Sequence, residues 1–114
     1  MRVAQRVLAW ERAPVRSRIE ITLLSPADMR RLNRRATGRR GVTDVISYSL
    51  PQPDGSLLGD VYICPEVAGS QEELVRLAVH GTLHVLGYDH PEGAERTRSR
   101  MWRVQERYVR RLLR

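Results

Sequence analysis

The three histidines of this chain fall within eleven consecutive residues. His80 and His84 are four residues apart, a spacing that places both side chains on one face of an α-helix. Gly87 is the residue type that ends helices in a left-handed conformation, after which the chain can carry His90 back toward the pair. A single buried histidine is usually a satisfied core residue. Three at this spacing favour a catalytic zinc site with a fourth position left for water, so we predict one Zn²⁺ per chain on His80, His84 and His90.

The residues beside these ligands limit the chemistry. Zinc peptidases of similar helical spacing carry Glu directly after the first His as their general base. Gly81 occupies that position here, which argues against peptide hydrolysis by that route. Asp89 precedes the third ligand and is a candidate to orient a ligand or to accept a proton. A residue of this type is equally typical of the turn after a helix, and the sequence leaves both readings open.

The charge of the chain points to a polyanionic partner. The net charge is +7, and all 20 basic residues are arginine. The planar guanidinium grips phosphate oxygens through two hydrogen bonds and stacks on bases, so nucleic acid is the leading candidate. A loop expected over residues 34–41 is dense in arginine. It is either a solvated surface loop or a phosphate-binding loop, and in the second case Arg35, Arg39 and Arg40 are the candidate RNA-binding residues.

Length and composition set the remaining bounds. A chain of 114 residues is expected to form a single domain, residues 1–114. It has no apolar run long enough to cross a membrane and no apolar signal core near its N-terminus, so we expect no membrane partner. Cys64 is the only cysteine, which excludes an internal disulfide, fits a reducing cytoplasm and favours a small buried hydrophobe.

The elements around the histidines predict an α+β fold. We expect a small mixed β-sheet of three to four strands packed against helices, with a central buried helix carrying the metal in a zincin-like ligand arrangement. Asp54-Gly55 predicts an antiparallel hairpin, and Ser70-Gln-Glu-Glu73 is a capping box that starts the central helix. The expected helices cover residues 3–13, 26–33, 70–86 and 94–113, and the expected strands cover residues 18–24, 43–50 and 57–63.

With these pieces placed, the chain resembles the YbeY family of bacterial rRNA maturation factors, which are metal-dependent endoribonucleases. The resemblance covers most of residues 19–113. It is carried by three stretches: His80-Gly-Thr-Leu-His84-Val-Leu-Gly87-Tyr88-Asp89-His90, Thr43-Asp44-Val45-Ile46-Ser47-Tyr48 and Gly59-Asp60-Val61-Tyr62-Ile63-Cys64.

The resemblance implies a cytoplasmic endoribonuclease of single-stranded RNA that acts in rRNA 3′-end maturation and ribosome quality control. It implies rRNA precursor, the small ribosomal subunit and ribosomal proteins as partners. Zinc would supply a bound water as nucleophile, or would stabilise the phosphate while the ribose 2′-hydroxyl attacks, and the sequence does not choose. The family pattern usually has Arg before Gly in the loop ahead of Thr43, and Thr37 stands there in this chain.

Two other functions remain as alternatives. One is a non-catalytic ribosome-assembly or RNA-binding factor with a structural zinc, which the displaced arginine favours. A structural zinc normally has four protein ligands, however, and the sequence offers no suitable fourth. The other is a metal-dependent hydrolase of peptides or small molecules, which Gly81 disfavours.

Overall fold

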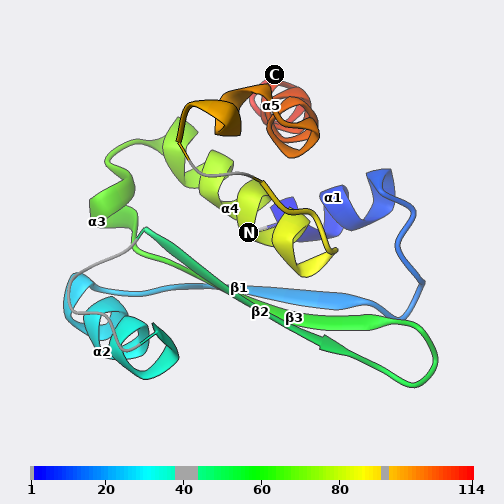
Figure 1. Ribbon diagram of the computed structural model, residues 1–114, viewed down its shortest axis with the longest axis horizontal. Coiled ribbons are helices and arrows are strands. Elements are labelled where there is room, and N and C mark those ends of the chain that lie inside the picture. Colours follow the sequence, from blue (N-terminus) through cyan, green and yellow to red (C-terminus); the bar gives the residue numbers. More distant parts are fainter. Residues whose placement is uncertain (1, 38–43, 91–92) are drawn as a thin grey trace.

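The computed structural model describes residues 2–37, 44–90 and 93–114. Within these ranges the chain has the predicted α+β architecture, with a sheet packed against helices (Figure 1). The elements, in chain order, are α1 (Val3–Trp10), β1 (Arg18–Leu23), α2 (Pro26–Thr37), β2 (Val45–Pro51), β3 (Leu57–Ile63), α3 (Pro65–Ala68), α4 (Gln71–Val85), the 3₁₀ helix η1 (Gly93–Arg98) and α5 (Arg100–Leu112).

The three strands form one mixed sheet in the order β1-β3-β2. β2 and β3 are antiparallel, as the Asp54-Gly55 turn predicts, and Gly55 supplies the positive φ of 88° that the turn needs. β1 pairs in parallel with β3, so the central strand is protected on both edges. Val61 and Ile63 of β3 are fully buried and form the floor on which the helices pack.

Helix α4 lies across one face of the sheet, and α1 lies beside α4 and also contacts β1 (Figure 1). Helix α5 covers the side of α4 that faces away from the strands. The predicted cap is present, because the Ser70 hydroxyl accepts a hydrogen bond from the backbone N–H of Glu73 at 3.1 Å. The helix is buried along most of its length, as its uncharged sequence predicts. The metal-ligand candidates therefore sit on the best-packed element of the fold.

Gly81 is explained by the sheet beneath it. A Cβ built on Gly81 would lie 2.5 Å from Cγ1 of Val61 and 3.3 Å from Cγ2 of Val45. The glycine thus lets α4 approach the strands closely, and this packing offsets the poor helix propensity of glycine, about 1 kcal/mol relative to Ala.

Cys64 is fully buried with a free thiol, as expected of a small core residue.

The first helix is shorter than predicted. It ends at Trp10 rather than Ala13, because Arg12 adopts a left-handed conformation with φ of 54°. This conformation stops the helical hydrogen-bond pattern before Pro14 does. Strands β1 and β3 follow the predicted bounds to within one residue, whereas β2 runs from Val45 through Pro51.

The second helix is longer than predicted. It continues to Thr37 instead of ending near Asn33, so Arg34 and Arg35 are helical and do not belong to a loop. Both arginines lie in the last turn, where the partial negative charge of the helix C-terminus stabilises cations. The predicted RNA-binding residues Arg39 and Arg40 lie outside the described residues.

The final helix is broken. The expected single helix over residues 94–113 is a 3₁₀ segment, Gly93–Arg98, followed by α5. Ser99 separates the two, because its hydroxyl accepts from the backbone N–H of Trp102 at 3.1 Å and caps the new helix. Over the described ranges, no helix is long and apolar enough to cross a membrane.

Candidate metal centre

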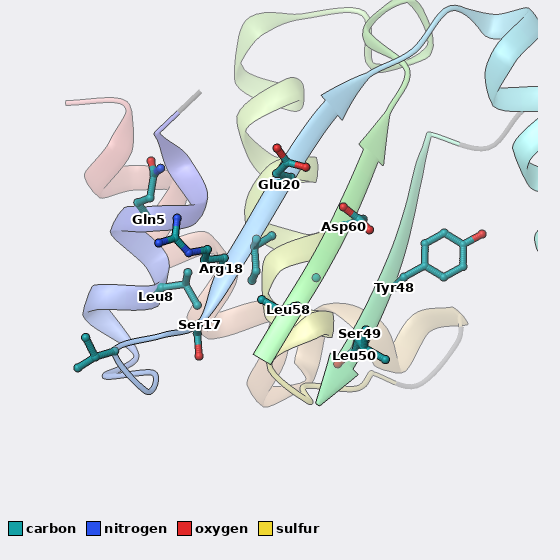
Figure 2. Close-up of a pocket in the computed structure, with 13 residues that line it drawn as sticks. Gln5, Leu8, Ser17, Arg18, Glu20, Tyr48, Ser49, Leu50, Leu58 and Asp60 are labelled. Carbon is teal, nitrogen blue, oxygen red and sulfur yellow. The ribbon is translucent and has the colours of Figure 1, made fainter. Parts of the chain in front are cut away.

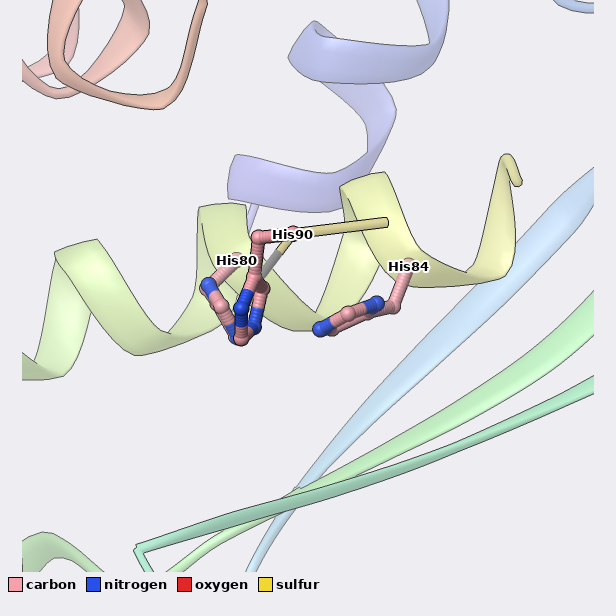
Figure 3. A group of neighbouring side chains, drawn as sticks. All are labelled: His80, His84 and His90. Atoms are coloured by element: carbon pink, nitrogen blue, oxygen red, sulfur yellow. The ribbon is translucent and has the colours of Figure 1, made fainter. Parts of the chain in front are cut away.

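The structure brings the three histidines together. His80 is buried and His84 half-buried, one turn apart on α4, and their ring centroids are 4.5 Å apart. The ring of His90 lies 5.1 Å from each of them. Figure 3 shows the three side chains converging along one side of the helix.

The chain reversal that returns His90 is a helix-ending motif with two hydrogen bonds. The backbone N–H of Tyr88 donates to the Leu83 carbonyl and that of Gly87 donates to the His84 carbonyl, both at 3.0 Å. This pattern is the Schellman motif, and it requires a left-handed residue at Gly87, whose φ is 100°. The glycine predicted to end the helix therefore also sets the direction in which His90 approaches.

The group can hold one metal ion. One ring nitrogen from each histidine lies within 4.8 Å of the others. Among the described residues, this is the group of His, Cys, Asp or Glu side chains whose ligand atoms come that close together. All donors are imidazoles. Zinc, copper, iron and nickel accept imidazole, whereas magnesium and calcium select oxygen ligands, so the donor set fits a zinc-like ion.

Two hydrogen bonds determine which nitrogens are available. Nδ1 of His84 lies 3.0 Å from the backbone carbonyl oxygen of Tyr88, which can only accept. Nδ1 of His80 lies 2.7 Å from Oε1 of Gln105. Each Nδ1 therefore carries a proton, and each Nε2 presents its lone pair. This is the arrangement in which metal-binding histidines are oriented by a second partner.

The Gln105 side chain is itself held in place. Its Nε2 donates to a carboxylate oxygen of Glu106 at 3.1 Å, and Glu106 accepts two bonds from Arg76, at 2.9 and 3.0 Å. Arg76 also donates to Glu73 at 2.7 Å. Because the carboxylate can accept only from the amide nitrogen, the amide oxygen must face His80. A chain of four side chains thus fixes the orientation of one ligand.

The electrostatic environment keeps the pair neutral. Burial lowers the pKa of His80 to about 4, against a smaller opposing effect of the Gln105 hydrogen bond, with the neighbouring histidines and Arg96 lowering it further. Burial also lowers the pKa of His84. Neutral imidazole is the form that binds a metal, so these two ligands need to lose no proton at pH 7.

The turn that carries His90 is anchored to two helices. The Tyr88 hydroxyl donates to one carboxylate oxygen of Glu11 at 2.7 Å, and the Tyr108 hydroxyl donates to the other. Burial, reinforced by Glu11, raises the pKa of Tyr88 and raises that of Tyr108 to about 12, so both phenols remain donors. Glu11 therefore ties the end of α1 to α5 and to the metal turn.

The other predicted site residues are placed differently. Asp89 is exposed, and its carboxylate accepts from the backbone N–H of His90 at 2.9 Å, a turn-forming contact. Its catalytic role stays a prediction. Arg35 is exposed on the last turn of α2.

Two residues that support the site, Gln105 and Glu11, were not predicted from the sequence. The only available signal for Gln105 was an uncharged polar residue at the edge of the apolar stripe of the last helix.

Two cavities lie near these elements. One, of about 450 Å³, has His80 in its wall together with Arg96, Trp102 and Gln105. The other, of about 920 Å³, lies on the open face of the sheet beside α1 (Figure 2). Its lining includes Glu20, Tyr48, Leu58 and Asp60, and it contains none of the histidines. The smaller cavity is therefore the one that borders a candidate metal ligand and its hydrogen-bond partner.

Comparison with known proteins shows which class of protein has this fold and this group of histidines. The family model described as Endoribonuclease YbeY matches residues 1–113, which is nearly the whole chain. The class is that of the endoribonucleases. The chain belongs to the YbeY family, as the histidine signature predicted.

Relatives from three bacteria agree with this assignment. The endoribonuclease YbeY of Micrococcus luteus is 36% identical in an alignment 126 positions long, gaps included. The alignment covers 96% of this chain and 79% of the relative. That of Frankia casuarinae is 37% identical, with 80% and 55% covered. That of Mycobacterium tuberculosis is 35% identical, with 80% and 62% covered. The chain thus spans less than two thirds of the length of the last two.

A solved structure shares the fold. The solution structure of TM1509 from Thermotoga maritima superposes with a TM-score of 0.56 at 26% sequence identity. The match covers 94% of this chain and 71% of that protein. The α+β architecture around the histidines is therefore shared with a protein characterised in solution.

Proposed function

We propose that this chain is a zinc-dependent endoribonuclease of single-stranded RNA. The observation that carries the proposal is the convergence of His80, His84 and His90, with the Nε2 atoms of the first two turned away from their hydrogen-bond partners. One Zn²⁺ per chain would bind these rings, since three imidazoles leave a further coordination position open. Family membership supports the choice of RNA as substrate.

The residues of the chain have separable tasks in this reaction. When bound, zinc supplies Lewis acidity, either lowering the pKa of a water or stabilising charge on a phosphate. The α4 backbone and the Schellman turn orient the three rings, and Gln105 and the Tyr88 carbonyl hold the protons on the Nδ1 atoms. Asp89 is exposed to solvent and directly precedes His90, where it would accept a proton.

The substrate is proposed to be ribosomal. The family to which the chain belongs, together with its charge of +7, supports a role in rRNA 3′-end maturation and ribosome quality control in the cytoplasm, with rRNA precursor, the small subunit and ribosomal proteins as partners. Arg35 would contact phosphates from the end of α2, and Arg39 and Arg40 would extend that contact. Backbone contacts of this kind position RNA without reading its bases.

The decisive experiment measures cleavage of labelled single-stranded rRNA fragments. Wild type, His84→Ala and Arg35→Ala are compared after chelation and again after zinc is restored, with the exposed Gln71→Ala on the same helix as control. We expect zinc to restore cleavage to wild type and to Gln71→Ala but not to His84→Ala. Arg35→Ala should raise KM with little change in kcat.

Two outcomes would reject this function. Cleavage that survives His84→Ala unchanged would rule out the metal mechanism. RNA binding without cleavage in any zinc-loaded variant would favour an assembly factor in which zinc has a structural role.

A further inference from the structure

The outward face of α5 is a continuous row of arginines. Met101, Val104, Tyr108 and Val109 are buried on the inner face of this helix. On the opposite side five exposed arginines of α5 share an arc of about 100° at 100° per residue. We call these five, together with Arg114 two residues past the end of the helix, the arginine stripe. They are Arg100, Arg103, Arg107, Arg110, Arg111 and Arg114.

Within the described residues, no ion pair links the stripe to an acidic side chain. Among the described residues, the ion pairs within 4.0 Å include none of these six guanidinium groups. Glu106 is the only acid on α5, and Arg76 of α4 already engages both of its oxygens. Arg110 still interacts electrostatically with Glu106, and the Arg103 guanidinium donates to the Arg98 carbonyl at 2.7 Å. These contacts leave the stripe with a large net positive charge.

The arrangement does not favour the helix itself. Like charges three and four residues apart destabilise a helix by about 0.2–0.5 kcal/mol per pair. Arg100 also lies at the first position of the helix, where the positive end of the helix dipole opposes a cation, whereas Arg110 and Arg111 lie in the last turn, where the dipole favours one. A stripe that costs stability in this way is explained more readily by a ligand than by folding.

Aromatic rings hold part of the stripe in position. The guanidinium of Arg111 lies 4.2 Å from the centre of the Trp10 ring, and that of Arg107 lies 5.7 Å from the Tyr108 ring. Arg6 of α1 lies over the same Trp10 at 5.1 Å, which adds a seventh charge beside the stripe. Contacts of this kind restrict the side chains before any ligand binds.

The stripe starts next to the metal centre. The Arg100 guanidinium lies 5.7 Å from the ring of Tyr88, two residues before His90. From there the helix extends for about 20 Å, given a rise of 1.5 Å per residue. A strand whose scissile phosphate lies at the histidines can therefore continue along α5.

The arginine side chains of the stripe and the buried apolar face of α5 favour a nucleic acid over a membrane surface as the partner. A membrane-surface helix needs an apolar face free to enter the lipid, and the apolar face of α5 is buried against α1 and α4. A row of forked donors at neighbouring positions instead suits the repeated phosphates of a nucleic acid strand. We propose that the arginine stripe is an accessory RNA-binding surface that holds the part of a single-stranded RNA lying outside the metal centre. This inference rests on the proposed function for the identity of the strand.

The test separates binding from cleavage. The triple variant Arg103→Gln, Arg107→Gln, Arg110→Gln removes three charges with a residue of similar helix propensity. The control triple variant Arg12→Gln, Arg16→Gln, Arg18→Gln removes three exposed charges from the segment that follows α1 and from the start of β1. Affinity of the metal-free proteins is measured for single-stranded RNAs of about 5 and about 25 nucleotides over a range of salt concentrations.

We expect the stripe variant to bind the long RNA at least about tenfold more weakly, and its slope of log K against log salt to fall by about 2. Its binding and zinc-dependent cleavage of the short RNA should be unchanged, and the control triple variant should bind the long RNA within about twofold of wild type. Unchanged long-RNA affinity in the stripe variant, or an equal loss in the control, overturns the proposal. Tighter binding to phosphatidylserine vesicles than to RNA also overturns it.

Failure of the proposed function gives a different result. If neither RNA is cleaved by the zinc-loaded wild type but the stripe variant alone loses long-RNA affinity, the accessory surface stands and the endoribonuclease assignment falls. His84→Ala, which removes a metal ligand, should leave long-RNA affinity unchanged. A parallel loss of affinity in His84→Ala would contradict a binding surface that is separate from the metal centre.

Discussion

The amide oxygen of Gln105 lies 2.7 Å from Nδ1 of His80, although the two residues are 25 positions apart in the sequence. Gln105 is 1% exposed and sits on a different helix from His80. Since the Gln105 amide nitrogen is committed to Glu106, the amide cannot flip without losing two hydrogen bonds. A candidate metal ligand on α4 is therefore oriented by α5, which contributes to the candidate metal centre as well as to the core.

Replacing Gln105 with leucine should weaken metal binding. Gln105→Leu fills a similar volume but leaves Nδ1 of His80 without its acceptor, and loss of such an outer partner typically costs about 10–100-fold in metal affinity. The measurement is competition for zinc against a chromophoric chelator. Gln71→Leu, at an exposed position of the same helix as His80, is the matched control and should bind zinc as the wild type does.

A result in which both variants bind zinc as wild type does would show that ring orientation is set by packing alone. A result in which both lose affinity equally would point to a general loss of folding, which the thermal unfolding of the metal-free proteins would reveal.

The Arg76–Glu106 pair predicts a stability loss in acid. Burial by itself would raise the pKa of Glu106, but the hydrogen bonds from Arg76 and Gln105 outweigh it and lower the pKa below its usual value. A carboxyl with a depressed folded pKa contributes stability that is fully present above its unfolded pKa and is lost as the pH falls through the folded one. We expect Glu106→Gln to unfold at lower denaturant concentration at pH 7 and to show a flatter pH dependence below pH 4.5.

Urea unfolding at several pH values measures both effects. The control is Glu95→Gln, since Glu95 is exposed and its oxygen lies 3.9 Å from Arg98. Parallel curves for Glu106→Gln and wild type across the acid range would contradict the assigned role of the pair.

The convergence of the three histidines could be predicted from the sequence because the rules that bring them together are local. His80, His84, Gly87 and His90 lie within one helix and its exit turn, and each rule used for them concerns neighbours in the chain. The strand pairing of β2 with β3 was likewise predictable from a two-residue turn. The fold class follows from these local elements together with the amphipathic final segment.

The residues that support the ligands were not predictable in the same way. Gln105 and Glu11 act across 25 and 77 positions, respectively, on His80 and Tyr88. Nothing in the spacing of either residue marks it, because the contact exists only after α1 and α5 have packed on α4. The break at Ser99 was missed for a related reason. A serine inside an arginine-rich amphipathic segment reads as one more exposed polar position until its hydroxyl is seen to cap a helix.

Gly81→Ala should destabilise the fold through the sheet. The new methyl group would lie 2.5 Å from Cγ1 of Val61, a fully buried side chain, so overpacking of about 1–3 kcal/mol should exceed the helix-propensity gain of about 1 kcal/mol. Adding Val61→Ala removes the opposing methyl groups and should recover part of the loss, which chemical denaturation of the single and double variants measures. Additive destabilisation in the double variant would show that the two side chains do not compete for the same space.

Glu11→Ala should loosen the turn that carries His90. The variant removes the acceptor of two tyrosine hydroxyls, those of the half-buried Tyr88 and the buried Tyr108, and each hydroxyl left without a partner costs about 1–3 kcal/mol. Because Tyr88 is two residues before His90, we expect weaker zinc binding as well as lower stability, whereas Glu66→Ala on the exposed side of α3 should change neither. Zinc competition combined with urea unfolding separates the two effects. Tyr108→Phe, which breaks only the bond to α5, should lower stability more than zinc affinity, and the reverse order would show that the turn is held from α5 and not from α1.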